Sequence, residues 1–272
     1  MSITLENKQC IIAGDGKLPI VFSQNAKKNG FEVIAISLSS DNKNELKKYC
    51  TKVYTFGPGE VKRIKSTLKE EGIKQVTFLG KVHKGLLLRC PKLDEEAIDL
   101  MKREKRLNDD AVMLTIVEEL EKLGITVLDQ TIFIKNLLIP TGVLGNISPT
   151  KEQLQDIDYG FWLAKEMGKL DVGQSVVIKN KMIMAVEAIE GTDKCIERGC
   201  KLARKKEAVV VKVAKPTQDR RFDIPTVGLN TLKIMKKYGA NVLAVEAAET
   251  IIVNQEELIK YANKNKIVVL AI

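Results

Sequence analysis

A short cationic segment in the last third of the chain carries two carboxylates. The stretch KPTQDRRFDIP, residues 215–225, surrounds Asp219 and Asp223 with lysine and arginine side chains. Aspartate oxygens bind divalent cations, and the basic side chains attract phosphate oxygens. Because phosphoryl transfer needs cations to neutralise charge and a carboxylate to hold a metal or orient water, the segment predicts such chemistry. A solvated loop with internal ion pairs is the alternative interpretation.

Other acidic residues interrupt apolar stretches that have the pattern of strands. Glu187 lies in SVVIKNKMIMAVEAI, a predicted hairpin that turns near residues 179–181, and Glu246 lies in the predicted strand NVLAVEAAETIIV. A carboxylate buried without a partner is costly, so each should meet a cation, a hydrogen-bond donor or water. The sequence EGTD, Glu190–Asp193, closes one strand and opens a helix, which predicts either a helix cap or a contribution to a ligand site at the strand end.

A glycine-containing turn lies near the amino terminus. AGDGKLP, residues 13–19, joins a predicted strand to a predicted helix, and Gly14 and Gly16 let the backbone turn tightly. Amide groups beside a helix amino terminus favour an anion, so the turn predicts contact with a phosphate or nucleotide. It lacks the third glycine of a dinucleotide-binding fingerprint and is not a P-loop. A tight strand-to-helix turn without a ligand is the alternative.

The elements that must position these residues alternate along the chain. In the first half, the short apolar strands QCIIAG, FEVIAISL, KVYTFG and QVTFLG alternate with amphipathic helices, which predicts a parallel sheet covered on both faces. Residues 131–149 contain prolines and glycines in a weakly periodic stretch, which indicates a linker or crossover. We therefore predict an α/β protein with an amino-terminal domain over residues 1–130 and a second α/β domain with a mixed sheet over residues 150–272.

The cationic segment has predicted elements on both sides. Residues 208–213 have the largely apolar pattern of a buried strand, and Thr226 is expected to begin a helix after the segment. The segment is therefore expected at the mouth of a sheet. Earlier in this domain, Thr150 has the position of a helix N-cap, with Gln153 in the first turn.

Composition restricts the classes of partner. The net charge of +9 and the isoelectric point of about 9.1 favour nucleic acid, phosphorylated metabolites or an anionic membrane surface. Aromatic residues make up only 5% of the chain, and no basic cluster is interleaved with stacking rings, which argues against binding of single-stranded nucleic acid. Much of the excess charge is lysine on predicted helices, where solvated side chains are the simpler interpretation.

Cysteine and histidine usage indicates compartment and excludes some metal sites. The five cysteines have no close CxxC spacing, and the single histidine, His83, cannot complete a usual zinc quartet and is expected in a loop. Reduced thiols in a cytosolic protein are the simplest interpretation. The amino terminus lacks the apolar core of a signal peptide, and no run approaches the roughly 20 apolar residues of a membrane span. The protein is expected to be soluble or to rest on a membrane.

Five motifs occur in the order, and at about the separations, of a known family. AGDGKLP, DVGQSVVI, AVEAIEGTD, KPTQDRRFDIPTVG and AVEAAETII resemble the LpxI family, and the resemblance spans nearly the whole chain. The motifs from Asp171 onward are specific when taken together. One departure is Asp15, where the family more often has another glycine in a GGG-like turn. A side chain there would narrow the approach of the backbone to a ligand.

LpxI proteins are UDP-2,3-diacylglucosamine pyrophosphatases of lipid A biosynthesis. The resemblance implies hydrolysis of that substrate to 2,3-diacylglucosamine 1-phosphate (lipid X) and UMP, with water directed at the α-phosphorus. It also implies a divalent metal, usually Mg²⁺, and a Rossmann-like first domain with a substrate cleft between it and the second domain. A lipid substrate places the expected enzyme at the cytoplasmic face of the inner membrane as a peripheral protein, and a homodimer is left open.

The resemblance also implies roles for individual residues. The essential aspartate of the family lies in a QD motif, which maps onto Asp219, the expected catalytic residue. The expected metal ligands are Asp219, Asp223 and Glu187. The groups expected to bind the substrate come from both domains: Gly14, Asp15, Gly16, Lys17, Glu190, Gly191, Thr192, Asp193, Lys215, Gln218 and Arg220.

Several other functions compete with this interpretation. Calcineurin-like phosphoesterases that cleave the same bond use several histidines around two metals, which a chain with one histidine cannot supply. A non-catalytic nucleotide-binding or regulatory module predicts binding without turnover and leaves Asp219 and Asp223 unexplained. A dinucleotide-dependent oxidoreductase requires a fuller glycine fingerprint and an acid after the second strand, where ISLSS has serines. A nucleic-acid binder would need a recognisable motif beside the charge, so no nucleic-acid partner is expected.

Overall fold

The structure of the protein is a computed structural model. The structure describes residues 4–39, 41–81, 93–103 and 109–272. His83 and Cys90, for which a loop position and a reduced thiol are expected, lie outside these ranges. The chain divides into two compact units. The first comprises Met1–Lys135 with Arg220–Phe222, and the second comprises Asn136–Asp219 with Asp223–Ile272.

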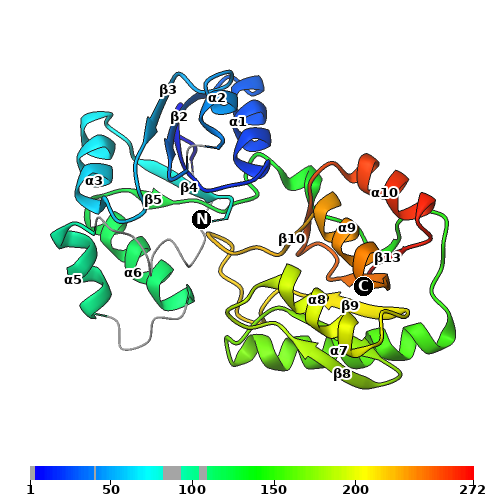
Figure 1. Cartoon of the computed structure of the whole chain (residues 1–272). Coiled ribbons are helices and arrows are strands. Elements are labelled where there is room, and N and C mark those ends of the chain that lie inside the picture. Colours follow the sequence, from blue (N-terminus) through cyan, green and yellow to red (C-terminus); the bar gives the residue numbers. More distant parts are fainter. Residues whose placement is uncertain (1–3, 40, 82–92, 104–108) are drawn as a thin grey trace. The chain divides into compact units, whose positions relative to one another are not determined.

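The described part of the first unit contains a five-stranded parallel sheet in the order β3-β2-β1-β4-β5 (Figure 1). Its strands are β1 (Lys8–Ala13), β2 (Glu32–Ser37), β3 (Lys52–Thr55), β4 (Gln75–Leu79) and β5 (Thr126–Val127). Its helices are α1 (Leu18–Lys28), α2 (Lys43–Leu46), α3 (Val61–Glu70), α5 (Glu95–Arg103) and α6 (Asp109–Lys122). Helices α1 and α2 lie on one face, and α3, α5 and α6 on the other.

Burial explains why these short segments form central strands. Ile12 and Ile34 pack in one core cluster with Leu68 of α3 and Val117 of α6. On the α1 side, Phe22 is fully buried. Strands that are apolar on both faces are typical of a parallel sheet between two helical layers. The predicted doubly covered parallel sheet is therefore confirmed.

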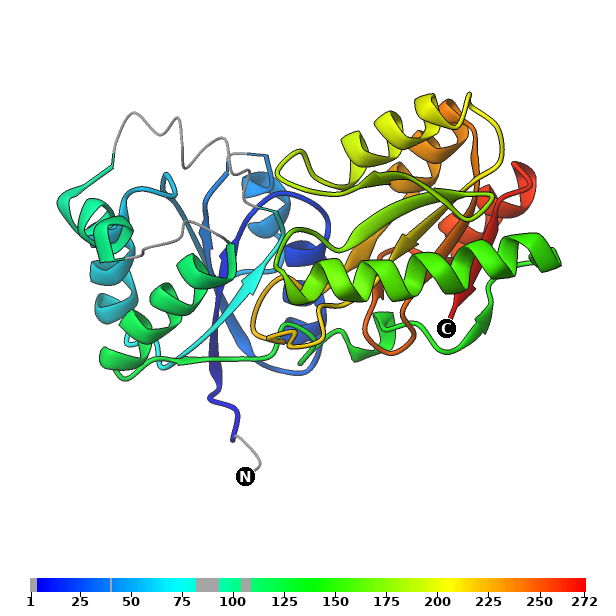
Figure 2. The same ribbon diagram turned by 90° about the horizontal axis from the view of Figure 1, so that it is seen from below.

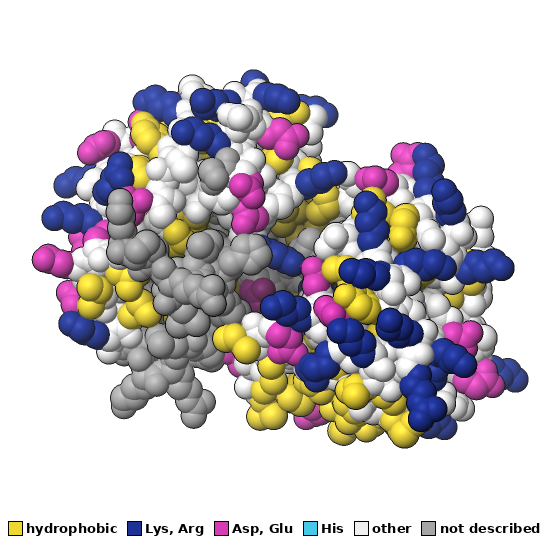
Figure 3. Space-filling model, in the orientation of Figure 1, with side chains coloured by type: hydrophobic (Ala, Val, Ile, Leu, Met, Phe, Trp, Pro, Cys, Tyr) yellow, Lys and Arg dark blue, Asp and Glu magenta, His cyan; other side chains and the backbone are white. Residues whose placement is uncertain are grey.

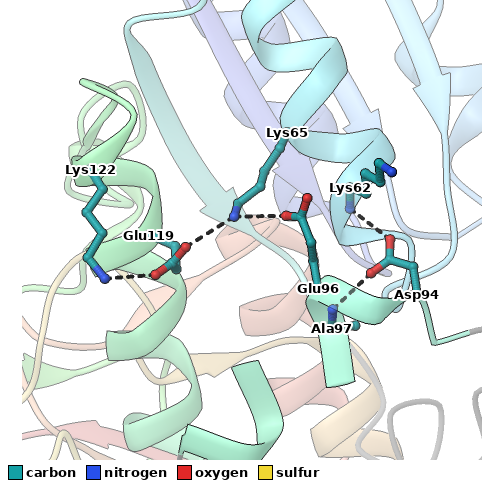
Figure 4. Close-up of polar contacts among 7 residues, drawn as sticks. All are labelled: Lys62, Lys65, Asp94, Glu96, Ala97, Glu119 and Lys122. Atoms are coloured by element: carbon teal, nitrogen blue, oxygen red, sulfur yellow. Dashed lines mark hydrogen bonds and ion pairs between the residues drawn. The ribbon is translucent and has the colours of Figure 1, made fainter. Parts of the chain in front are cut away.

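A charged cluster on the surface joins the helices of one layer (Figure 4). The Lys65 ammonium of α3 lies 2.9 Å from Glu96 of α5 and 3.1 Å from Glu119 of α6, and Lys122 approaches Glu119 at 2.8 Å. Asp94 precedes α5 and accepts backbone hydrogen bonds from the first turn of α5 and from the start of α3. The capping carboxylate favours the start of α5 and ties it to α3.

The described part of the second unit has a six-stranded mixed sheet in the order β6-β13-β11-β9-β7-β8. Its strands are β6 (Gly142–Val143), β7 (Ser175–Lys179), β8 (Met182–Val186), β9 (Ala208–Lys212), β11 (Ala240–Val245) and β13 (Val268–Ala271). A separate parallel pair consists of β10 (Thr226–Val227) and β12 (Ile251–Ile252). The helical segments are η1 (Lys135–Leu137), which begins at the last residue of the first unit's main segment, α7 (Lys151–Lys169), α8 (Thr192–Leu202), α9 (Leu229–Tyr238) and α10 (Gln255–Lys264).

Helices cover both faces of the second sheet as well. Figure 2 shows α7 lying along one face, with α8 and α9 on the opposite side. Two apolar clusters fill these layers: Ala164 of α7 packs with Val211 on one side, and Ile196 of α8 packs with Leu232 of α9 on the other. Thr150 caps α7 in a reciprocal arrangement with Gln153, as predicted. The predicted mixed sheet is therefore confirmed.

The predicted hairpin is present. Strands β7 and β8 are antiparallel and turn through Asn180 and Lys181, whose φ angles are 50° and 59°. Two positive φ values are characteristic of the tight turns that match strand twist. Asp156 of α7 accepts hydrogen bonds from both turn amides at 2.9 and 2.6 Å. The helix thus holds the turn in a conformation that a non-glycine residue rarely adopts.

Two predicted elements are wrong. Thr226 was expected to begin a helix, but it forms β10 with Val227, and α9 begins only at Leu229. The strand predicted over NVLAVEAAETIIV is interrupted, because β11 ends at Val245 and β12 begins at Ile251. Residues 246–250 read EAAET, and the apolar runs on both sides of them led to the prediction of one continuous strand. No helix among the described residues is both long and apolar enough to cross a bilayer.

Candidate functional site at the carboxyl edge of the second sheet

One edge of the second sheet collects charged residues at the ends of its strands. Strand β7 is antiparallel to both β8 and β9, and β9 is parallel to β11, so the carboxyl ends of β8, β9 and β11 share one edge. Glu187 follows β8, Lys212 ends β9 and Glu246 follows β11. Both glutamates were expected inside strands and lie one residue beyond them. This edge is where ligands bind in open α/β sheets.

Lys215 follows β9 and is buried, with 6% of its surface exposed. Its ammonium lies 2.6 Å from Asp171 Oδ1 and 3.6 Å from Asp223 Oδ2. Gln174 Nε2 donates a hydrogen bond to the same Asp223 oxygen at 2.6 Å. A charged group at this depth needs carboxylates or other polar partners. The structure therefore brings together two predicted residues, Lys215 and Asp223, and adds Asp171 and Gln174 to them.

A second network surrounds Lys212, which has 9% of its surface exposed. Its ammonium donates to Thr192 Oγ1 at 3.1 Å and to the carbonyl oxygen of Thr226 at 3.3 Å. Thr192 in turn donates to Glu187 Oε1 at 2.9 Å, while Glu187 Oε2 is buried and has no hydrogen-bond partner among the described residues. Buried carboxylate oxygens normally accept hydrogen bonds, so this oxygen is available to accept one from a donor group of a ligand.

Glu246 has a structural partner. Lys165 of α7 donates to both of its carboxylate oxygens at 2.6 Å and to the carbonyl oxygen of Ala214 at 2.9 Å. The amide of Ala214 donates back to Glu246 Oε2 at 2.8 Å. These bonds tie α7 to the ends of two neighbouring strands. Glu246 thus supports the edge on which the two lysine networks lie.

The EGTD segment shapes the start of α8. Gly191 precedes the helix with a φ of 79°, and Glu190 forms an ion pair with Arg198. Burial raises the pKa of Glu190, but hydrogen bonds from Arg198 and from the backbone outweigh it and hold the pKa below its ordinary value. Asp193 accepts a hydrogen bond from α9. The N-cap residue of α8 is Gly191, and no side chain of the EGTD segment makes a capping hydrogen bond, so the expected side-chain cap is not formed. Thr192 instead joins the network around Lys212 at the edge of the sheet.

The cationic segment passes briefly into the first unit. The amide of Gln218 closes a turn after β9, and Asp219 follows it with a half-exposed side chain. Arg220 Nε then lies 2.9 Å from Asp129, and Phe222 is buried in the core of the first unit. Arg220 was predicted to steady a diphosphate beside Lys215. In the structure its guanidinium is engaged by Asp129.

The amino-terminal turn is closed by backbone contacts. Asp15 and Lys81 form an antiparallel bridge, with the Asp15 amide donating to the Lys81 carbonyl at 2.8 Å. The Gly14 amide donates to the end of β4. A Cβ atom on Gly14 would lie 2.4 Å from the Lys81 carbonyl oxygen, so a side chain does not fit here. The amides of Gly14 and Asp15 are therefore engaged within the first unit.

The other predicted residues of this turn lie at the start of α1. Gly16 and Lys17 are exposed, and Gly16 has a φ of 100°. Asn42, which the sequence analysis did not single out, donates from Nδ2 to the carbonyl oxygens of Gly14 and Gly16 at 2.9 and 2.8 Å. These hydrogen bonds close the turn, and its exposed part, which can face an anion, is the amino terminus of α1.

The predicted metal ligands are Asp219, Asp223 and Glu187. Among the described residues, no group of three or more histidine, cysteine, aspartate and glutamate side chains is placed to hold a metal ion. Asp223 lies beside Lys215, and Glu187 is hydrogen-bonded to Thr192. The structure therefore offers no preformed cage of protein ligands in this range. The use of a metal stays a prediction.

Cysteine chemistry is not favoured at this edge. The four described cysteines are buried and form no disulfides; they are Cys10, Cys50, Cys195 and Cys200. Burial raises the pKa of Cys195 to about 12 and that of Cys200 to about 11. A thiol with such a pKa is not a nucleophile near neutral pH.

Sequence reasoning missed residues that the fold brings to the site. The importance of Lys212 could have been predicted, because a lysine inside the apolar run AVVVKVA must be buried with a partner or lie at a strand end. Asp171 and Gln174 lie within DVGQSVVI, a motif noted only for its resemblance. Their partners are 44 and 49 residues away in the chain, so no local pattern indicates the contacts.

Comparison with solved structures finds distant, partial similarity. An N5-carboxyaminoimidazole ribonucleotide synthetase from Thermotoga maritima is 16% identical, with a TM-score of 0.26 over 66% of this chain and 40% of that one. An ADP complex of purK, also an N5-carboxyaminoimidazole ribonucleotide synthetase, is 13% identical, with a TM-score of 0.27 over 76% and 47% of the two chains. This chain spans less than half the length of either protein. These scores carry no inference about fold or function.

Comparison at the level of sequence is more informative. The chain matches the LpxI N-terminal domain over residues 8–137 and the LpxI C-terminal domain over residues 140–270. It is 30% identical to the UDP-2,3-diacylglucosamine pyrophosphatase LpxI of Caulobacter vibrioides over 271 residues, covering 96% of each chain. The motifs at the edge of the second sheet and the amino-terminal turn fall inside the two matched domains. The chain belongs to the LpxI family.

Proposed function

We propose that this protein hydrolyses the pyrophosphate bond of UDP-2,3-diacylglucosamine, releasing UMP and 2,3-diacylglucosamine 1-phosphate (lipid X) as a step of lipid A biosynthesis. The activity named for the Caulobacter relative supports this substrate. The observation that best supports this chemistry is the buried Lys215, which is paired with Asp171 and Asp223. Lys215 lies four residues before Asp219 in the chain. A carboxylate beside preorganised cations suits hydrolysis of a phosphoric anhydride.

The cationic and anionic residues of this edge would have different roles in the reaction. A diphosphate gains negative charge on its leaving group as the bond breaks, and fixed ammonium groups in water-poor surroundings stabilise that charge strongly. Lys215 and Lys212 are the two buried cations at this edge within the described residues. Asp219 is half-exposed and would orient the water that attacks the α-phosphorus. Thr192 and Gln218 would contribute polar contacts to the substrate.

A divalent cation is part of the proposal. Mg²⁺ is often held by one or two carboxylates together with phosphate oxygens, so a cage of three protein ligands is not required. Asp219 would be its protein ligand, because it is the half-exposed aspartate of the QD motif that the resemblance marks as essential. When bound, the ion would neutralise charge on the diphosphate. Chelation with EDTA is expected to abolish UMP release, and added Mg²⁺ to restore it; full activity in EDTA would remove the metal from the mechanism.

The central experiment measures both products. Purified protein is incubated with UDP-2,3-diacylglucosamine in water enriched in ¹⁸O, and UMP and lipid X are analysed by mass spectrometry. Attack at the α-phosphorus puts the label in UMP, whereas attack at the β-phosphorus puts it in lipid X. Release of UDP in place of UMP would show cleavage of the sugar bond and overturn the proposal. Binding without any turnover would favour the nucleotide-binding module.

The catalytic assignment is tested with a matched pair of variants. Asp219→Asn removes the charge but keeps the shape, and we expect a loss of about 10²-fold or more in the rate of UMP release. Asp158→Asn changes an exposed aspartate on α7 and should leave the rate unchanged. An Asp219→Asn protein as active as the Asp158→Asn protein would remove Asp219 from the catalytic role.

A peripheral position on the cytoplasmic face of the inner membrane is the final part of the proposal. On the face shown in Figure 3, apolar side chains gather along the lower edge of the second unit, with lysines beside them. The large apolar side chains that are more than half exposed in this unit are Trp162, Leu170, Met182, Ile189 and Leu202. Tryptophan favours the membrane interface, and lysine favours anionic lipid. Flotation with anionic vesicles should be weakened in Trp162→Ser, and unchanged flotation would exclude Trp162 from membrane contact.

A further inference from the structure

The segment that carries Asp219 also carries an aromatic residue of the other unit's core. Phe222 has 3% of its surface exposed and packs in the apolar cluster of the first unit, together with Phe56 and Phe78. Asp219 and Asp223, on either side, belong to the second unit. The chain therefore enters the first unit for Arg220–Phe222 and then returns. We call these three residues the anchor segment.

Polar contacts hold the anchor segment in addition to Phe222. The amide of Gln130 donates to the Arg220 carbonyl oxygen at 2.9 Å, and Arg220 Nε lies 2.9 Å from Asp129 Oδ2. Arg221 lies 3.1 Å from Glu121. Burial raises the pKa of Asp129, but hydrogen bonds from its neighbours, including Arg220, outweigh it and lower the pKa below its ordinary value, which keeps the carboxylate charged for this pair. The anchor segment is thus fixed by backbone, charged and apolar contacts together.

The residues on the other sides of the aspartates are fixed as well. The Gln218 amide donates to the Lys215 carbonyl oxygen at 3.0 Å, which closes a turn directly before Asp219. Asp223 has a φ of 56° and accepts a hydrogen bond from Gln174 at 2.6 Å. Along the chain, Asp219 therefore follows a closed turn of the second unit and directly precedes the anchor segment. Its backbone has little freedom, although its side chain is half-exposed.

We propose that Phe222 is a positioning residue, whose burial in the first unit sets the location of the Asp219 carboxylate. A catalytic group that is held in place avoids the entropy loss of being ordered during reaction, and a displacement of about 1 Å can cost roughly 10²-fold in rate. This inference rests on the proposed function, because it requires Asp219 to act on the substrate. It predicts that weakening the Phe222 anchor lowers kcat and leaves KM nearly unchanged.

A matched pair of variants separates positioning from stability. Phe222→Leu and Phe56→Leu each shorten a phenylalanine in the same apolar cluster, and both keep a bulky side chain so that the protein folds. We expect Phe222→Leu to lower kcat about tenfold or more and Phe56→Leu to change it less than twofold, with similar shifts in the melting temperature of both. Equal kcat values in the two variants would overturn the positioning role.

A double mutant shows whether Phe222 acts through Asp219. If it does, adding Phe222→Leu to Asp219→Asn causes no further loss, because the group being positioned is already absent. Multiplying losses would mean that Phe222 supports the fold or another group, and would overturn the inference. A wild-type protein that releases no UMP would reject the proposed function and this inference together. An active wild type with equally active leucine variants would reject the inference alone.

Discussion

The carboxyl edges of the two sheets are built in different ways. In the first unit, the edge is closed by backbone: Asp15 and Lys81 form a bridge, and Gly14 approaches the Lys81 carbonyl so closely that no Cβ fits. In the second unit, the same kind of edge holds two buried lysines, Lys212 and Lys215, with hydroxyl and carboxylate partners. One edge depends on shape and the other on charge. We therefore expect charge-dependent chemistry in the second unit.

The largest expected effect is the loss of activity when a buried charge of the second unit is removed. Lys215→Met keeps the length of the apolar stem but removes the ammonium that faces Asp171 and Asp223. We expect UMP release to fall about 10²-fold or more, since a preorganised cation is lost from the site. Lys17→Met removes an exposed lysine of the amino-terminal turn and should cost less than about tenfold, because exposed charges are strongly screened. Equal losses in steady-state rate would contradict the comparison.

The second prediction concerns a substitution that disrupts the close backbone contact between Gly14 and Lys81 in the first unit. Gly14→Ala places a Cβ atom 2.4 Å from the Lys81 carbonyl oxygen and should lower the free energy of unfolding by about 2–4 kcal/mol. Gly16→Ala meets no neighbouring atom but has a φ of 100°, so its cost should be about 1 kcal/mol from backbone strain alone. Urea denaturation measures both. A Gly14 variant as stable as the Gly16 variant would show that the bridge can move apart.

A smaller effect on stability is expected for the Lys165–Glu246 pair, which supports the charged edge of the second sheet. Glu246→Gln removes the charge that accepts two bonds from Lys165 and should lower the free energy of unfolding by about 1–3 kcal/mol. Glu256→Gln is the control, because its pair with Lys260 is exposed and such pairs contribute about 0–1 kcal/mol. Urea midpoints of the two variants are compared at pH 7. Indistinguishable midpoints would show that the Lys165–Glu246 pair is not a support.

The smallest effect concerns pH and the charged cluster of the first unit. Hydrogen bonds from Lys122 and Lys65 lower the pKa of Glu119 to about 2, against an opposing effect of burial. A carboxylate whose pKa is lowered in the folded protein stabilises the fold at pH values above its ordinary pKa of 4.5. This stabilisation is lost as the pH falls towards 2. Glu119→Gln should therefore lower stability slightly at pH 6 and flatten its decline between pH 4.5 and 2, as followed by urea midpoints. An unchanged pH profile would exclude Glu119 from acid unfolding.

Much of the fold was accessible from periodicity, because strands between helices are apolar on both faces. The parallel first sheet, the β7–β8 hairpin and the Thr150 cap were all predicted from local patterns and are confirmed. The break between β11 and β12 was not, since Glu246 leaves the strand to meet Lys165 on a helix 81 residues away. Local hydrophobicity carries no information about such a partner.

The sequence by itself determined most of the element types, the family and the cationic segment with its aspartates, because these depend on residue identity and short spacing. Tertiary structure alone decided the partners of the charges. It placed Lys215 beside Asp171, engaged Arg220 with Asp129, and buried Phe222 in the core of the first unit. The physical reason is that burying a charge or an aromatic ring is favourable only where complementary groups converge. Those groups come from segments that are remote in the chain and meet only when it folds.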